Sequence, residues 1–342
     1  MAWATPRYTK GQVDNAGRTL VRQGATSEEL DEALEIVGNW RAIHAFPLNT
    51  FQMRLRSAAS RVYDNALVAQ RLKRLSSIEF KLRRFRDMNL ARMQDIGGCR
   101  AVLRNPSQVR RLARDYKASR IKHQLVGEKD YITNPKDSGY RGVHLIYRYH
   151  SSRTSTYNGL LIELQIRSLL QHAWATAVET VGIFLEHSLK SSMGPNEWLR
   201  FFALSASAFA RVERSTLVPG TPQTDRQLLG EIGRLKRELD VEQRLRTFGQ
   251  ALQVTERASP REAHFFLLAL MGEKLTIYSY RKDQLQEATH QYLEIEKRTE
   301  NVAGAQTVLV AAESLKALRR AYPNYYLDTE RFLESLRRAT AR

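Results

Sequence analysis

The segment around Glu163 has the clearest chemical pattern in the sequence. In residues 161–167 apolar and polar side chains alternate, so a strand here would have one apolar and one polar face. The polar face would carry Glu163, Gln165 and Arg167. Unpaired charges on a sheet face are costly, so this face needs a substrate, a metal ion or other side chains as partners. Glu163 is therefore a candidate metal ligand and a candidate general base.

A second carboxylate, Asp95, stands just before a short apolar stretch, residues 99–103. Gly97 and Gly98 lie between them and let a ligand approach the backbone, so Asp95 could hold a cation at a strand edge. A turn in which Asp95 only binds nearby amides fits the segment equally well by itself. Together, Asp95 and Glu163 suit Mg²⁺, which keeps few protein ligands and completes its shell with substrate phosphates.

A group of four cations surrounds a predicted helix start. Ser76 and Glu79 have the spacing of a capping box, which predicts that a helix begins there. Free backbone amides at a helix start favour anions, so a triphosphate fits this place. Taken alone, such a cluster is more often a solvated helix face. The four cations are Arg71, Lys73, Lys81 and Arg84.

Residues 130–144 contain one proline and two glycines, which predicts a loop before the next strand. An exposed tyrosine in such a loop can stack on a base while neighbouring cations neutralise phosphate. A lone Tyr or His in this place would more often serve packing. The side chains concerned are Lys136, Tyr140, Arg141 and, on the first turn of the strand, His144.

Short strands and amphipathic helices must position these residues. The central region is mixed α/β, because a predicted helix at residues 106–116 is flanked by three predicted strands. The strands are expected at residues 99–103, 143–149 and 160–166. Helices are expected at residues 27–37, from 49 to beyond 67, and at 171–209, 225–255, 284–299, 312–320 and 329–338. Residues 265–271 and 275–280 predict a hairpin.

The whole-chain composition indicates a folded protein with a polyanionic partner. A chain of 342 residues with 42% hydrophobic content can form two or three domains. The net charge of +18 attracts phosphates, although a charged, soluble surface is the plainer alternative. We find no apolar run long enough for a membrane span and no secretory leader in residues 1–10, and the lone Cys99 excludes an internal disulfide. We expect a cytoplasmic protein with no membrane partner.

The four segments described above, in this order and spacing, resemble the synthetase domain of the RelA/SpoT family over about residues 63–179. The resemblance implies an α+β fold with a mixed β-sheet flanked by helices and a nucleotidyltransferase-like core. It also implies an enzyme that transfers pyrophosphate from ATP to a ribose 3′ hydroxyl. The family's alarmone hydrolase domain depends on a His-Asp dipeptide, which this sequence lacks, so no hydrolase activity is expected.

The resemblance also implies a binding site for ATP. Arg71 and Arg100 would sandwich the adenine. The phosphates would be bound by Lys73, Lys81 and Arg84.

The remaining roles implied by the resemblance concern the metal and the acceptor. Asp95 and Glu163 would hold Mg²⁺, and Glu163 would also activate the acceptor hydroxyl. Tyr140 would stack on the acceptor base. The acceptor would be positioned by Lys136, His144 and Gln165.

The carboxyl-terminal stretch, residues 265–336, resembles the CapRel type of fused toxin-antitoxin synthetase. The core of that type is similar to toxic small alarmone synthetases that pyrophosphorylate the 3′ end of tRNA and stop translation. The resemblance implies a zinc-finger-like element, which would bind no zinc here because the tail has no cysteine. Tyr322 and Tyr325 would block the ATP site, and a phage structural protein would release them. Simple packing of these tyrosines between two helices is the alternative.

These patterns predict four regions and leave three functions open. The regions are a helical amino-terminal region 1–60, a pyrophosphokinase domain 61–190, a helical linker region 191–256 and a small α/β regulatory region 257–342. The leading hypothesis is an autoinhibited phage-defence toxin whose acceptor is the tRNA 3′ CCA end. The alternatives are an alarmone synthetase with GTP or GDP as acceptor, which the four motifs cannot distinguish from the first, and a non-catalytic RNA-binding module.

Overall fold

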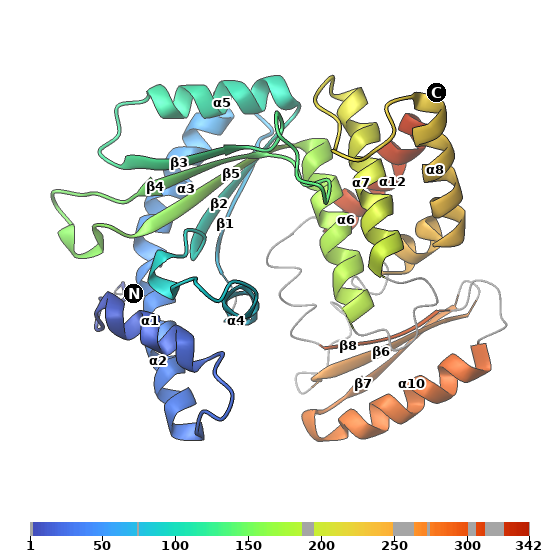
Figure 1. Cartoon of the computed structure of the whole chain (residues 1–342), viewed down its shortest axis with the longest axis horizontal. Helices are drawn as coiled ribbons and strands as arrows, with labels where there is room; N and C mark the ends of the chain where they lie inside the picture. The colour runs from blue at the N-terminus through green and yellow to red at the C-terminus, as the bar shows by residue number, and fades with distance from the viewer. Residues whose placement is uncertain are drawn as a thin grey trace. The chain divides into compact units, whose positions relative to one another are not determined.

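The computed structural model describes residues 3–73, 75–186, 195–248, 263–271, 274–299, 306–311 and 325–341. The chain divides into two compact units, which we describe separately (Figure 1). The first unit comprises Met1–Ile132 and Gly142–Leu169, and the second comprises Thr133–Arg141 and Leu170–Arg342.

A five-stranded mixed sheet forms the centre of the first unit. The strand order is β1-β2-β5-β4-β3. Strands β2 and β5 are parallel, and the other neighbouring strands are antiparallel. The strands are β1 Leu67–Leu72, β2 Gly97–Leu103, β3 Gln124–Asp130, β4 Val143–Arg148 and β5 Leu161–Ser168. The three predicted strands are therefore confirmed as β2, β4 and β5.

Helices α3 (Ala45–Ser60) and α5 (Pro106–Ala118) cover one face of this sheet. The start of α5 is fixed by the Asn105 side chain, which accepts a hydrogen bond from the Gln108 backbone N–H. Apolar side chains then recur at helical spacing along α5 and pack in one core with the apolar face of β5. Two further helices, α1 (Lys10–Thr19) and α2 (Ser27–Ile43), each begin with a capping box.

The opposite face of the sheet is polar. The side chains of Ile162, Leu164 and Ile166 are fully buried in the core beneath α3 and α5. The alternate residues of β5 therefore lie on the other face, as the period of two predicts. Register places Gly98 beside Glu163, and Arg100 and His144 on either side of Gln165.

The two edge strands, β1 and β3, were not predicted. The helix expected to run beyond residue 67 ends at Ser60, and β1 follows it. The side chains of β1 and β3 are exposed or half-buried, so neither strand shows the apolar alternation of a strand with one buried face. Helix α4 (Leu75–Arg84) begins one residue before Ser76, so Ser76 does not precede the helix as the predicted capping box requires.

The second unit combines helices with a small antiparallel sheet of order β7-β6-β8. The predicted hairpin is confirmed as β6 (Phe265–Met271) and β7 (Lys274–Tyr280). The charged helix expected to reach residue 255 ends at Glu238, near a residue with positive φ, Asp240. The remaining elements are α6 Leu169–Glu186, α7 Pro195–Val212, α8 Asp225–Glu238, α10 Leu285–Thr299, β8 Gln306–Ala311 and α12 Tyr325–Thr340. The helix predicted at 312–320 lies outside the described residues.

The carboxyl-terminal helix α12 is part of the helical core of the second unit. Phe332, Leu333 and Leu336 are fully buried at helical spacing. The ring of Phe332 contacts Phe209, with centroids 5.5 Å apart in an edge-to-face arrangement. Helix α12 therefore packs against α7 through its apolar face.

No helix among the described residues is both long and apolar enough to cross a membrane. Helices α1, α2 and α3 belong to the same compact unit as the five-stranded sheet. The boundaries at residues 60, 190 and 256 stay a prediction.

Candidate active site

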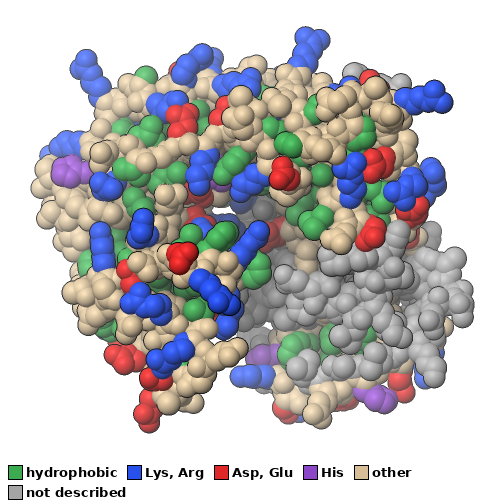
Figure 2. All heavy atoms as spheres, viewed as in Figure 1, with side chains coloured by type: hydrophobic (Ala, Val, Ile, Leu, Met, Phe, Trp, Pro, Cys, Tyr) green, Lys and Arg blue, Asp and Glu red, His purple; other side chains and the backbone are tan. Residues whose placement is uncertain are grey.

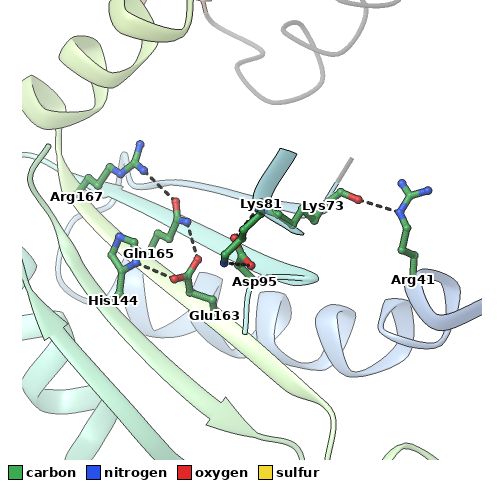
Figure 3. Close-up of polar contacts among 8 residues, drawn as sticks. All are labelled: Arg41, Lys73, Lys81, Asp95, His144, Glu163, Gln165 and Arg167. Carbon is green, nitrogen blue, oxygen red and sulfur yellow. Dashed lines mark hydrogen bonds and ion pairs between the residues drawn. The ribbon is translucent and has the colours of Figure 1, made fainter. Parts of the chain in front are cut away.

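The polar face of the sheet carries a chain of hydrogen bonds built on β4 and β5 (Figure 3). Glu163 Oε1 lies 2.8 Å from His144 Nδ1, and Glu163 Oε2 accepts a hydrogen bond from Gln165 Nε2 at 2.7 Å. Gln165 Oε1 in turn accepts one from Arg167 Nη2 at 3.0 Å. Strand pairing aligns these groups, since the β5 members are two residues apart and His144 lies opposite Gln165.

The environment of Glu163 keeps its carboxyl group ionised. Glu163 is only 9% exposed, and burial alone would raise its pKa. The hydrogen bonds from His144 and Gln165, together with the positive charge of Lys81, outweigh burial and lower the pKa of Glu163 to about 2. A charged carboxylate at neutral pH suits a metal ligand and a proton acceptor.

The second carboxylate, Asp95, lies between two lysines. Lys73 Nζ is 2.7 Å from Asp95 Oδ2, and Lys81 Nζ is 2.9 Å from Asp95 Oδ1. Lys73 follows the end of β1, where its N–H donates to the Ile96 carbonyl, and Lys81 lies on α4. Burial acts to raise the pKa of Asp95, but the two ammonium groups hold it below its usual value.

Lys81 links the two carboxylates electrostatically. Its ammonium is bonded to Asp95 and also lowers the pKa of Glu163, and Figure 3 shows the groups on the same side of the sheet. No cluster of three or more His, Cys, Asp or Glu side chains suited to a metal occurs in the described part of the chain. Two carboxylates with cations around them nevertheless fit Mg²⁺, which takes few protein ligands when phosphates supply the others.

The three arginines expected to bind ATP occupy different surroundings. Arg100 is buried on β2 beside Gln165 on the polar face, and Arg71 is exposed opposite Gly98. Arg84 is exposed at the end of α4, and its guanidinium lies 5.4 Å from the centroid of the Phe85 ring. Two of the three arginines thus lie on strands that form the polar face, whereas Arg84 lies over an aromatic ring of the following turn.

The residues expected to bind the acceptor divide between the two units. His144 and Gln165 both hydrogen-bond to Glu163 in the first unit. Lys136 and Tyr140 belong to the loop Thr133–Arg141 of the second unit, with Lys136 Nζ 5.2 Å from the Tyr140 ring centroid. Tyr140 is partly buried against the helical core, so packing, the alternative left open for it, describes its contacts here.

Two residues near the site were missed from the sequence. The Tyr131 ring meets the His144 ring edge to face at 5.3 Å, and Arg41 Nε donates to the Lys73 carbonyl at 2.8 Å. Tyr131 stands in the loop segment already singled out, next to the end of β3. No local pattern connects Arg41 with Lys73, because the contact joins α2 to residues 32 positions further along.

The expected autoinhibitory residues fall at the edge of what the structure describes. Tyr322 lies outside the described residues. Tyr325 is the first residue of α12, and its side chain is also outside the description. Their role stays a prediction.

Comparison with known proteins agrees with the site. Residues 70–183 match a family profile whose description is "Region found in RelA / SpoT proteins". The chain is 32% identical over 131 residues to GTP pyrophosphokinase YjbM of Bacillus subtilis, which is 38% of this chain and 58% of that protein. It is 38% identical over 53 residues to GTP pyrophosphokinase YwaC of the same organism, covering 16% of this chain and 25% of that protein.

Solved structures of small alarmone synthetases from Bacillus subtilis also match. Small alarmone synthetase 1 bound to its product pppGpp is 24% identical, with 49% of this chain and 88% of that chain covered and a TM-score of 0.43. Small alarmone synthetase 2 is 22% identical, with 52% and 94% covered and a TM-score of 0.44. Asp95, Glu163 and their bonded partners all lie between residues 70 and 183, and over these residues the chain has the synthetase region of the RelA/SpoT family.

Proposed function

We propose that this chain is a pyrophosphokinase that transfers the β,γ-diphosphate of ATP to a ribose 3′ hydroxyl. The observation that carries the proposal is the pair of ionised carboxylates, Asp95 and Glu163, joined through Lys81 on the polar face of the sheet. The site combines these two acids with Lys73, Lys81 and Arg100, so positive charge is in excess and favours a polyphosphate. The match of residues 70–183 to the RelA/SpoT region supports the same reaction.

In the proposed reaction the acceptor hydroxyl oxygen bonds to the β-phosphorus of ATP while the bond from that phosphorus to the α,β-bridging oxygen breaks. AMP leaves with that oxygen, and the hydroxyl proton passes to the Glu163 carboxylate. His144 and Gln165 hold this carboxylate in one orientation through their hydrogen bonds. Lys73 and Lys81, bonded to Asp95 here, would turn to the phosphates and neutralise charge developing on them.

Asp95 and Glu163 are the residues that would hold Mg²⁺ in this proposal. The ion would supply charge neutralisation at the phosphate oxygens. Arg71 and Arg100 would hold the adenine between them, and Arg84 would contact the phosphate tail. We place the reaction in the cytoplasm, where ATP and both kinds of acceptor occur.

Two acceptors are proposed, each favoured by a different observation. The 3′ CCA end of tRNA comes first, because a net charge of +18 exceeds what a mononucleotide acceptor requires. GTP or GDP comes second, favoured by the relatives named GTP pyrophosphokinase. Lys136 and Tyr140 would bind either acceptor, since both offer phosphates and a base that can stack. With tRNA as acceptor the enzyme would be a toxin, silenced by Tyr322 and Tyr325 and released by a phage structural protein.

One assay tests both the reaction and its acceptor. The full chain is incubated with ATP labelled in the β and γ phosphates and with GTP, GDP and bulk tRNA side by side. Label in tRNA supports the first acceptor, and label only in guanine nucleotides supports the second. If no acceptor is labelled at any Mg²⁺ concentration while RNA still binds, the protein is the non-catalytic RNA-binding module.

A further inference from the structure

Helix α5 carries a basic outer face that takes no part in the candidate active site. Its apolar side packs on the sheet, and its exposed side presents Arg110, Arg111 and Arg114. Figure 2 shows Lys and Arg side chains along the edge of the molecule where Figure 1 draws α5. Exposed cations continue beyond both ends of the helix, at Arg104 and Arg120.

Most of this charge is not neutralised by the protein itself. Arg111 makes one long ion pair, 3.7 Å, with Asp115 on the same helix. Arg110 and Arg114 form no ion pair or hydrogen bond with any residue that the structure describes. A cation from another element adds to the surface, because the Arg54 guanidinium of α3 lies 5.9 Å from the centroid of the Tyr116 ring.

The charge of the first unit is distributed unevenly, so the face of α5 is more than an instance of general basicity. Helix α2 carries five acidic residues and one basic residue, whereas α5 carries four basic residues and one acidic residue. A surface that only required solubility would gain nothing from this separation. An uneven charge distribution attracts an anionic partner to one side of the molecule.

The chemistry of the face favours a phosphate backbone. None of the exposed large hydrophobic side chains among the described residues lies on α5. The face therefore has no aromatic platform for unstacked bases and no apolar side chain to enter a bilayer. Residues four apart on a helix are separated by about 6 Å, and a duplex strand carries one phosphate per about 3.4 Å of axis, so each arginine can reach a different phosphate.

The face is also separate from the candidate active site. Helix α5 covers the apolar face of the sheet, and Glu163 lies on the polar face. A sheet-to-helix packing distance of roughly 10 Å plus the helix radius puts roughly 15 Å of protein between the two. A mononucleotide in the site therefore cannot contact α5, but an extended polyanion can bind there independently.

We propose that the outer face of α5, with Arg110 and Arg114 at its centre, binds the phosphate backbone of a nucleic-acid duplex without sequence preference. The surface is distinct from the acceptor site and does not depend on which acceptor the enzyme uses. It raises the local concentration of the chain on structured RNA.

The test is the salt dependence of binding. Binding of the full chain to a fluorescent 20-base-pair RNA duplex is measured by anisotropy between 50 and 200 mM salt. We expect Arg110→Ala/Arg114→Ala to weaken binding about tenfold and to reduce the slope of log K against log salt by about 2, because two phosphate contacts are lost. The matched control is Arg226→Ala/Arg237→Ala, which removes the same charge from exposed positions of α8.

Further readouts distinguish a local phosphate-binding face from a damaged fold, from net charge and from a membrane surface. Diphosphate transfer to a mononucleotide should be unchanged in Arg110→Ala/Arg114→Ala, which shows that the protein is folded. Equal loss of RNA binding in the α5 and α8 variants would overturn the proposal in favour of net charge alone. Unchanged RNA binding in the α5 variant would also overturn it, as would loss confined to binding of vesicles containing phosphatidylserine.

Discussion

Glu163 is surrounded by groups that favour its charged form. An imidazole and an amide bond its two oxygens, and a lysine bonded to Asp95 adds positive charge nearby. Each partner lies on an element of the same compact unit. The carboxylate therefore keeps one orientation before a substrate binds, which lowers the cost of arranging it for reaction.

Replacing Glu163 tests the chemistry directly. We expect Glu163→Gln to lower diphosphate transfer at least 100-fold, because the amide neither binds a cation strongly nor accepts the hydroxyl proton. Transfer is measured with labelled ATP, and circular dichroism checks the fold. The control is Glu128→Gln, which removes an exposed carboxylate paired with Lys117 on β3 and should leave transfer unchanged. Comparable activity in both variants would contradict the assignment of Glu163.

The lowered pKa of Glu163 predicts how stability responds to acid. Its pKa falls from 4.5 to about 2 on folding, so the unfolded chain binds the proton more tightly. The resulting stabilisation, on the order of 2 to 3 kcal/mol, is fully present above about pH 5 and is lost as the pH falls toward 2. Urea unfolding at pH 7, 5, 4 and 3 should show a steeper loss for the wild type than for Glu163→Gln. Parallel curves would argue against this environment.

At the scale of elements, the loop Thr133–Arg141 is fixed by the helices of the second unit. Arg141 Nη2 donates to the Thr216 carbonyl at 3.0 Å and also bonds the Ser215 hydroxyl. Gly139 has a φ of +92°, and a Cβ there would lie 2.8 Å from the Ala206 Cβ and 2.9 Å from the Trp174 ring. Only glycine fits this close approach with this backbone conformation.

Substitution of Gly139 therefore tests the loop. We expect Gly139→Ala to destabilise the second unit by about 2 to 4 kcal/mol, from backbone strain and overpacking together. Gly220→Ala is the control, because its φ is +69° but a Cβ would meet nothing within 4 Å. Urea unfolding should show the larger loss for Gly139→Ala. If the loop binds the acceptor, the KM for the acceptor should rise more than the KM for ATP.

The elements also show how far a sequence can be interpreted. The alternation in residues 161–167 correctly predicted which side chains of β5 face the apolar core and which lie on the polar face. It could not reveal that His144 is the partner of Glu163, because that contact depends on the pairing of β4 with β5. The edge strands β1 and β3 gave no signal because they lack a buried face. Arg41 reaches Lys73 through helix packing, which no local pattern encodes.

At the scale of the molecule, α12 bears on how autoinhibition can be tested. Removing the chain from Ala321 onward would remove Phe332, Leu333 and Leu336 from the helical core. Losing several buried side chains costs several kcal/mol, so the truncated protein would be unstable whether or not the tail inhibits. Point substitutions that keep α12 are the better test.

We expect Tyr322→Ala/Tyr325→Ala to raise diphosphate transfer if these side chains block the ATP site. Two buried aromatic side chains contribute roughly 3 to 6 kcal/mol before entropy costs, which is enough to shift a closed state to an open one. The initial rate and the KM for ATP are measured at equal protein concentration. Tyr326→Ala serves as the control within the same segment. Unchanged or lower transfer in the double variant would contradict autoinhibition by this pair.

The place of β5 in the sheet has a consequence for protein synthesis. β5 leaves the ribosome after the other four strands of its sheet, yet it occupies the middle position, between β2 and β4. Until residue 168 has emerged, the nascent chain can hold only two separate hairpin-like pairs, β1 with β2 and β3 with β4. Interrupted translation therefore releases fragments in which Asp95 has no Glu163 to act with, so an aborted copy of this enzyme is inert.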